Sequence, residues 1–167
     1  MSQQDKNDMS QHFYRASAAD FMKIPGSPLA YWLSSRYMEA FDDGVPLSTF
    51  AKPVVGLQTG DNELFIRYWY EIDFKKIAFH ISSREEAKRS GLKWFPYTKG
   101  GDFRKWYGNN YWVVDWQNDG ERICAHPGAY PRNRERYFSP GLTYTNISSA
   151  SFASRYTDAG FIFDQKG

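Results

Sequence analysis

One stretch of the first half has apolar residues at clear helical spacing. Large apolar side chains recur every three or four residues at Leu29, Trp32, Leu33, Tyr37 and Phe41. Ser27 followed by Pro28 is a favourable helix start, and Gly44 can end the helix. The pattern predicts a helix over residues 28–42, with its aromatic side chains in the core.

Two further helices are predicted by their capping residues. Either Asp61 or Asn62 can cap a short helix directly after the polar loop "QTGDN". Ser83 is followed three residues later by Glu86, which is the capping-box spacing, and Gly91 is placed to end that helix. The first half is therefore expected to be rich in helices.

From Leu92 onward, short β-type runs replace the helical spacing. The runs are "KWFPYTK", "NYWVVDWQ", "GLTYTNIS" and "GFIFD", and the turn-forming sequences between them are "KGG", "NDG", "HPG", "SPG" and "DAG". They predict a mostly antiparallel sheet or a small curved barrel. The expected fold class is a single α+β domain over residues 18–167, preceded by a polar, disordered lead-in over residues 1–17.

The composition adds an unusual aromatic content to this picture. Aromatic residues make up 19% of the 167 residues, although the formal net charge is only +2. The basic excess is local, because residues 84–136 contain 11 Lys and Arg against 7 Asp and Glu. Many rings and a local positive charge favour a recognition surface for a polyanion over a uniformly basic nucleic-acid binder.

The sequence lacks the usual signs of secretion and of membrane insertion. Cys124 is the single cysteine, so no disulfide framework exists, and the chain has no signal-peptide pattern and no apolar run of membrane-spanning length. We expect a cytoplasmic protein that does not bind membranes.

No catalytic or cofactor-binding motif is recognisable. The chain has no Walker loop and no glycine-rich dinucleotide fingerprint. Cys124 and His126 offer only two metal ligands, so we expect no metal site. Asp115, Asp119 and Glu121 resemble a strand end and a turn more than a general acid and base. We expect no catalytic residues, no cofactor in this chain and no activity of the chain by itself.

The segment "KGGDFRKWYGNN" has the residue types of a DNA-contacting loop. Its candidate DNA-binding residues are Lys99, Gly100, Gly101, Arg104, Lys105, Trp106, Tyr107, Asn109 and Asn110. The glycines allow close backbone approach, and the cations neutralise phosphates. The aromatic residues can stack on bases, and the asparagine amides can read an adenine edge.

Two later segments extend the candidate DNA-binding set. Arg132 and Arg134 belong to "YPRNRERYF", where an extended backbone would place Arg132, Arg134 and Arg136 on one face. Thr143, Thr145 and Ser148 belong to "TYTNISSASF", and their hydroxyl groups can contact the DNA backbone or bases.

Each cluster also has a purely structural interpretation. Trp94, Phe95, Trp112 and Trp116 fit a strand with its rings turned inward. Alternating arginines can protect an edge strand, and Ser and Thr commonly form turns. Two other functional classes stay open, namely a protein-interaction module and a small-ligand or sugar-binding domain, or a hydrolase, that uses the tryptophans as a platform.

Five stretches together resemble a known enzyme family. They are "KIPGSPLAYWLS", "GLQTGDNELFIRYWYE", "KWFPYTKGGDFRKWYGNNYWVVDW", "RNRERYFSPGLTYTNISSASFASRY" and "GFIFDQKG". They are similar to the PglX-type adenine-specific DNA methyltransferases of BREX phage-defence systems, over roughly residues 20 to 167. "WFPYTKGGDFRKWYGN" is the most specific of these pieces.

The resemblance implies a role in DNA modification. Enzymes of this family transfer a methyl group from S-adenosylmethionine to N6 of adenine, using an N-P-P-Y type motif that this chain lacks. We therefore expect the chain to correspond to the target-recognition region that follows the catalytic domain, as an excised or truncated piece. The implied partners are duplex DNA and other phage-defence proteins, and S-adenosylmethionine is expected only for the full-length enzyme.

Overall fold

A computed structural model describes residues 13–145 and 151–165 of a chain that divides into two compact units, Met1–Pro53 and Val54–Gly167. Within those residues, every strand lies in the second unit. The fold is of the expected α+β class, with its sheets concentrated in residues 54–167. No helix among the described residues has both the length and the apolar character needed to cross a membrane.

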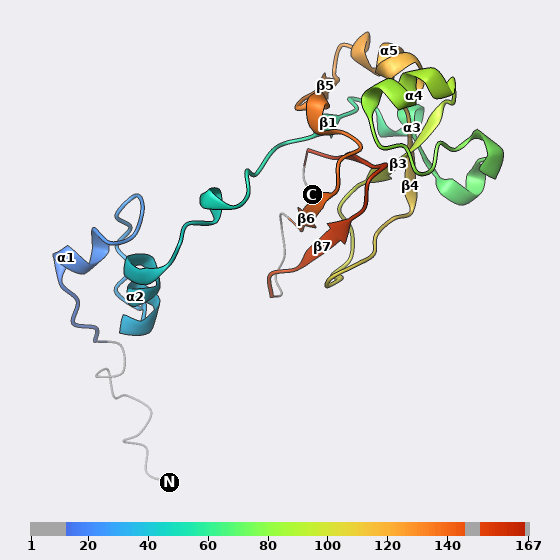
Figure 1. The fold of residues 1–167 in the computed structure, drawn as a ribbon. Helices are drawn as coiled ribbons and strands as arrows, with labels where there is room; N and C mark the ends of the chain where they lie inside the picture. The colour runs from blue at the N-terminus through green and yellow to red at the C-terminus, as the bar shows by residue number, and fades with distance from the viewer. Residues whose placement is uncertain (1–12, 146–150, 166–167) are drawn as a thin grey trace, which may run out of the picture. The chain divides into compact units, whose positions relative to one another are not determined.

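The first unit is small and helical (Figure 1). It contains the helices α1 (Ala18–Phe21) and α2 (Ser35–Asp43) and the 3₁₀ turn η3 (Leu47–Thr49). Its core consists of the buried residues Ile24, Ala30 and Met38 together with the partly buried Phe21 and Leu33.

The expected helix over residues 28–42 is wrong at its start. Residues before Ser34 form turns instead, in which the Leu33 amide donates to the Ala30 carbonyl at 3.1 Å. Ser34 is extended, with φ −70° and ψ 156°, so α2 begins only at Ser35. The expectation that the aromatic residues here are core is also wrong, because Trp32, Tyr37 and Phe41 are 59%, 65% and 47% exposed.

The second unit is built around a four-stranded sheet. Its strands are β2 (Ile66–Tyr68), β3 (Trp94–Thr98), β4 (Trp112–Asp115) and β8 (Ile162–Phe163), in the spatial order β2-β4-β3-β8. The pairs β2–β4 and β3–β4 are antiparallel, whereas β3 and β8 are parallel. The expected mostly antiparallel sheet is confirmed, and no closed barrel forms among the described strands.

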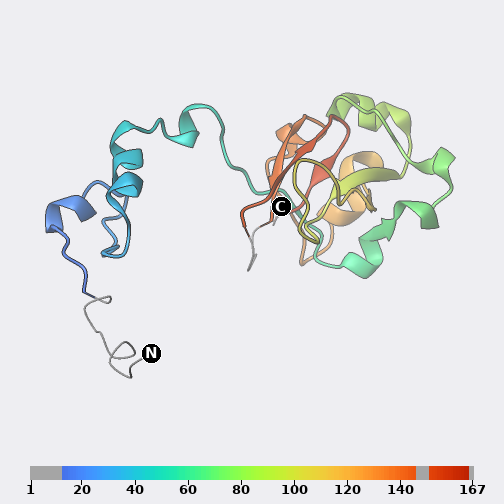
Figure 2. The ribbon, with the colours of Figure 1, turned by 90° about the horizontal axis from the view of Figure 1, so that it is seen from below.

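Two small antiparallel pairs complete the strands. β1 (Leu57–Gln58) pairs with β5 (Tyr130–Pro131), and β6 (Gly141–Tyr144) pairs with β7 (Ser154–Thr157). The orange β6 and the red β7 run side by side in both views of the ribbon (Figures 1 and 2). The remaining elements are α3 (Asn62–Phe65), α4 (Arg84–Ser90), α5 (Gln117–Cys124), η4 (Trp69–Glu71), η5 (Phe74–Lys76) and η6 (Arg134–Arg136).

The helix caps read from the sequence are largely confirmed. Asp61, and not Asn62, caps α3 by accepting a hydrogen bond from the Leu64 amide at 3.0 Å. The Ser83 hydroxyl caps α4, and Gly91 ends it in the left-handed conformation, with φ 64°. These signals are local, which is why the sequence alone reveals them.

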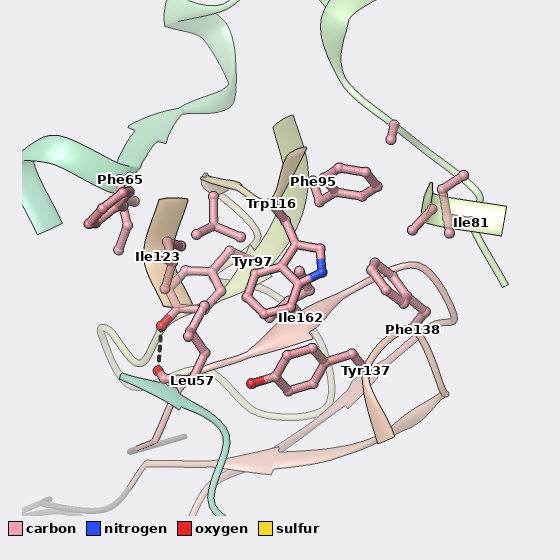
Figure 3. Close-up of a cluster of buried hydrophobic side chains, with 14 residues drawn as sticks. Leu57, Phe65, Ile81, Phe95, Tyr97, Trp116, Ile123, Tyr137, Phe138 and Ile162 are labelled. Carbon is pink, nitrogen blue, oxygen red and sulfur yellow. Dashed lines mark hydrogen bonds between the residues drawn. The ribbon is translucent and has the colours of Figure 1, made fainter. Parts of the chain in front are cut away.

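The sheet is buried on both faces. Phe95, Tyr97 and Val114 belong to the main core, which also receives Trp116, Phe138 and Ile162 (Figure 3). The buried Tyr97 hydroxyl donates to the Leu57 carbonyl at 3.0 Å and bonds to the Asp164 carboxylate at 2.8 Å. On the opposite face, Ile77, Trp94 and Val113 form a second cluster. Trp94, Phe95 and Trp116 are therefore core residues, and Trp112 is half-buried.

Candidate nucleic-acid interface

The loop of residues 99–111 that joins β3 to β4 carries most of the candidate DNA-binding residues. Five consecutive side chains, from Phe103 to Tyr107, are exposed. Trp106 is 73% exposed and Tyr107 is 66% exposed, which is unusual for large rings in a protein with a well-filled core. The loop therefore presents three aromatic and two basic side chains to its surroundings.

The backbone of Trp106 docks this loop on β7. The Trp106 amide donates to the Ser154 carbonyl at 2.9 Å, and the Tyr156 amide donates to the Trp106 carbonyl at 2.9 Å. In Figure 1 the yellow loop between β3 and β4 extends beside β7. These two bonds form an isolated parallel β-bridge between Trp106 and Arg155, which fixes the loop to the edge of the β6–β7 hairpin.

The hairpin presents a largely apolar face beside the loop. The strand register places Leu142 opposite Tyr156 and Tyr144 opposite Ser154, so these side chains share one face. Leu142, Tyr144 and Tyr156 are exposed, as is Phe152 just before β7. We call Phe103–Tyr107 together with these four residues the loop–hairpin surface.

Arg155 holds the loop and the hairpin together from the buried side. Only 2% of the residue is exposed, and its guanidinium donates to the Thr145 hydroxyl at 3.0 Å and to the Arg104 carbonyl at 3.5 Å. Burial lowers the pKa of Arg155 below its usual range. The sequence interpretation missed this residue, although it lies in an alternating pattern of buried positions, with Arg155 and Thr157 on β7 and Ala153 just before it.

The two adjacent asparagines of the loop lie in different environments. Asn109 is buried, and its amide donates to the Asp102 carbonyl at 3.0 Å. A β-carbon on Gly101 would lie 3.1 Å from Cγ of Asn109, so these two residues close the loop on itself. Asn110 is half-buried, and its side chain makes no hydrogen bond with any described residue. Asn109 thus positions the loop, whereas the amide of Asn110 is free to bind a ligand.

The remaining candidates at the start of the loop face solvent or a neighbouring ring. The Lys99 ammonium lies 5.1 Å from the centre of the Trp112 ring, and Lys105 lies 5.8 Å from that of Phe103. Lys99 and Gly100 also line a polar cleft of about 420 Å³. These contacts hold the two ammonium groups near rings without neutralising their charge.

The arginine cluster does not form the expected extended face. Asn133 is left-handed, with φ 50°, and residues Arg134–Arg136 form the turn η6. Arg132 is exposed and lies over Tyr130, whereas Arg134 Nη2 is 2.7 Å from Oδ2 of Asp119. Arg132 therefore stays available for a ligand, whereas Arg134 is already paired with Asp119.

Asp119 is the centre of an ion-pair network that joins α4, α5 and η6. Its carboxylate also pairs with Arg84 and with Lys88. Burial raises the pKa of Asp119, but the hydrogen bond from Arg84 and the charge of Arg134 outweigh burial and hold that pKa below its usual range. This geometry explains the acidic residue of the "NDG" turn as a structural anchor.

The hydroxyl cluster lies only partly within the described residues. Thr143 on β6 is half-buried, as is Thr145, which accepts the hydrogen bond from Arg155. Ser148 lies outside the described residues. Within those residues, no group of three or more His, Cys, Asp and Glu side chains could hold a metal ion.

The chain is similar to segments of two curated adenine-specific methyltransferases. It is 39% identical to the adenine-specific methyltransferase PglX of Lacticaseibacillus casei (strain Zhang), over 97% of this chain and 14% of that protein. It is 40% identical to the adenine-specific methyltransferase BrxX of Escherichia coli O9:H4 (strain HS), over 89% of this chain and 12% of that protein. No protein-family model matches the chain. The resemblance read from the sequence is confirmed: the chain is homologous to one segment, about one-seventh of the length, of the PglX and BrxX adenine-specific methyltransferases.

Proposed function

We propose that this chain is the DNA-recognition part of an adenine-specific methyltransferase and that the loop–hairpin surface contacts duplex DNA. The observation that carries the proposal is the run Phe103–Tyr107, whose cations and rings are all exposed and are held on β7 by two backbone hydrogen bonds. A surface that is fixed before binding loses little conformational entropy when it binds.

The side chains divide into two roles in this proposal. Arg104 and Lys105 contact phosphates, because they are exposed cations that form no ion pair with an acidic side chain among the described residues. Trp106 and Tyr107 offer exposed rings that can stack on bases or insert at a groove. Arg132 is a third phosphate contact. Asn109, Arg134 and Thr145 do not contact DNA in this proposal, because each is bonded to another residue of the protein.

The reaction itself belongs to the full-length enzyme. The relatives are named methyltransferases, and the chain covers 14% or less of their length. S-adenosylmethionine and the adenine N6 chemistry would therefore be supplied outside the segment. In the proposed enzyme this segment selects the DNA site, within a cytoplasmic phage-defence system whose other proteins are further proposed partners.

The phosphate contacts are tested by removing two charges together. Arg104→Ala plus Lys105→Ala should weaken binding of a labelled duplex about tenfold or more, and should lower the salt slope by about 2. Arg36→Ala plus Arg89→Ala is the matched control, because it removes two exposed charges from α2 and α4. Equal effects of the two double variants would refute a specific role of the loop.

A protein-docking role predicts a different salt response. The hairpin residues Leu142 and Phe152 are 72% and 73% exposed, which suits a protein interface equally well. Binding of a protein partner through this apolar face would change little between low and high salt, whereas phosphate binding weakens steeply.

A further inference from the structure

A cleft of about 620 Å³ opens on the sheet face opposite the main core. Pro96 and Val113, which pair across β3 and β4, line the cleft from the sheet. Its other walls come from the chain around η4 and η5, from the loop of residues 99–111 and from the turn of residues 158–161. The volume lies within the range of about 300–1,000 Å³ that is typical of small-molecule sites.

The walls of the cleft are mostly aromatic. They include the rings of Trp69, Phe74, Phe79, Tyr107, Trp112 and Phe161. The ring centres of Phe74 and Phe79 are 4.7 Å apart, and those of the stacked Trp112 and Tyr68 are 4.0 Å apart. Several rings of the cleft are therefore held in place by neighbouring rings. Phe74 is 64% exposed and Trp69 is 41% exposed, which leaves ring surface for a planar ligand.

A small number of polar groups face the same space. The amide of Asn110, which has no hydrogen-bond partner among the described residues, offers a donor and an acceptor side by side. Asp158 adds a carboxylate, which already accepts a hydrogen bond from the Tyr156 hydroxyl at 3.3 Å, and His80 adds an imidazole. The aromatic rings can stack on the faces of a nucleobase, and the amide and the carboxylate can accept hydrogen bonds from the N–H groups on its edge. A carboxylate in the cleft disfavours a bound phosphate.

The cleft is continuous with the loop–hairpin surface. Tyr107 lines the cleft and ends the exposed run that carries Arg104 and Lys105. Lys99 lies 5.1 Å from the ring of Trp112, a residue of the cleft wall, and Lys75 and Lys76 follow Phe74 directly. Cations therefore adjoin this ring-lined space, as expected where a backbone passes and a base enters.

From this geometry we infer that the cleft receives one unstacked nucleobase from the DNA that the loop–hairpin surface binds. The inference rests on the proposed function and makes it more specific. The base stacks on the exposed rings of the cleft, and the Asn110 amide bonds to its edge. The site is separate from any adenine site of the catalytic domain, because all of its lining residues belong to this segment.

The experiment compares two labelled duplexes that differ in one base. One is fully paired, and the other carries a single unpaired 2-aminopurine, whose fluorescence reports stacking. We expect the chain to bind the second duplex at least about fivefold more tightly and to quench its fluorescence. Phe74→Ala plus Asn110→Ala should abolish both the preference and the quenching, so that the two duplexes bind with equal affinity. Phe50→Ala, which removes a 77% exposed ring from the first unit, is the control.

The outcomes separate this inference from the proposed function. Tight, salt-dependent binding of both duplexes without preference or quenching would overturn the base site and leave DNA recognition standing. The base site would also be overturned if Phe74→Ala plus Asn110→Ala, shown by circular dichroism to be folded, still preferred the duplex with the unpaired base. If neither duplex binds, both proposals fail, and the cleft is better assigned to an aromatic side chain of a protein partner.

Discussion

The amide nitrogen of Trp106 lies 2.9 Å from the carbonyl oxygen of Ser154, which joins two segments far apart in the sequence. Together with the bond from the Tyr156 amide to the Trp106 carbonyl, it forms an isolated β-bridge that fixes the exposed loop to the edge of the hairpin. Trp106 reaches this position with a left-handed backbone, with φ 73°. The residues proposed to contact DNA are therefore positioned by a sheet edge.

Arg155 is predicted to control the order of this loop without contacting DNA. Arg155→Ala removes the bonds to Thr145 and to the Arg104 carbonyl, and should lower the free energy of unfolding by about 1–3 kcal/mol. Hydrogen exchange of the Trp106 and Tyr156 amides should become faster. Arg136→Ala, at an exposed arginine, should change neither quantity. Unchanged exchange in Arg155→Ala would show that the loop is held by other contacts.

Asn109 is predicted to act on the loop and not on a base. Asn109→Gly keeps the left-handed backbone that Asn109 has, with φ 63°, but removes the hydrogen bond to Asp102. It should lower stability by about 1 kcal/mol and leave any preference among DNA sequences unchanged. A change in sequence preference without a change in loop exchange would restore Asn109 as a base-reading residue.

Asp119→Asn is predicted to destabilise the second unit through charge alone. Asn tolerates the left-handed conformation of Asp119, with φ 62°, but cannot neutralise Arg84, Lys88 and Arg134. The cost should be about 2–4 kcal/mol at neutral pH, measured by urea denaturation. Because the pKa of Asp119 is lowered in the folded state, its contribution is present above the unfolded pKa and is lost as pH falls. A difference from wild type that persists in strong acid would contradict this origin.

Alkaline pH is predicted to destabilise the core through Tyr97. Burial raises the pKa of its hydroxyl well above the usual value of 10.0, so the folded chain keeps a proton that the unfolded chain releases. The contribution of Tyr97 to stability should be constant below about pH 10 and should fall above it. Tyr97→Phe should cost about 1–2 kcal/mol at neutral pH and should make the alkaline decline shallower. Denaturation curves at several pH values measure both effects, and an unchanged alkaline slope in the variant would contradict the assignment.

Features set by neighbouring residues could be predicted from the sequence, and features set by the tertiary fold could not. Ser83 and Gly91 bound α4 as expected, because both act within one helical turn. The helical spacing from Leu29 to Phe41 was misleading, because the helix begins only at Ser35 and much of the apolar face is exposed.

The same division holds within the candidate site. The candidates Arg104–Tyr107 are exposed, as a contact with DNA would require. Asn109 and Asn110, by contrast, have identical side chains, but Asn109 is buried and Asn110 is half-buried. Which of the two is buried depends on how the loop closes against Asp102. The buried Arg155 lies on a strand whose partner is fixed only by the fold.

The most direct test of the central claim is fluorescence anisotropy of the 167-residue chain with a labelled DNA duplex, at about 50 mM and 200 mM salt. The account predicts binding at the lower salt that weakens at least about tenfold at the higher salt, with Arg104→Ala plus Lys105→Ala losing most of that dependence. Absence of binding at low salt, by a chain whose circular dichroism and thermal unfolding show it to be folded, would contradict it.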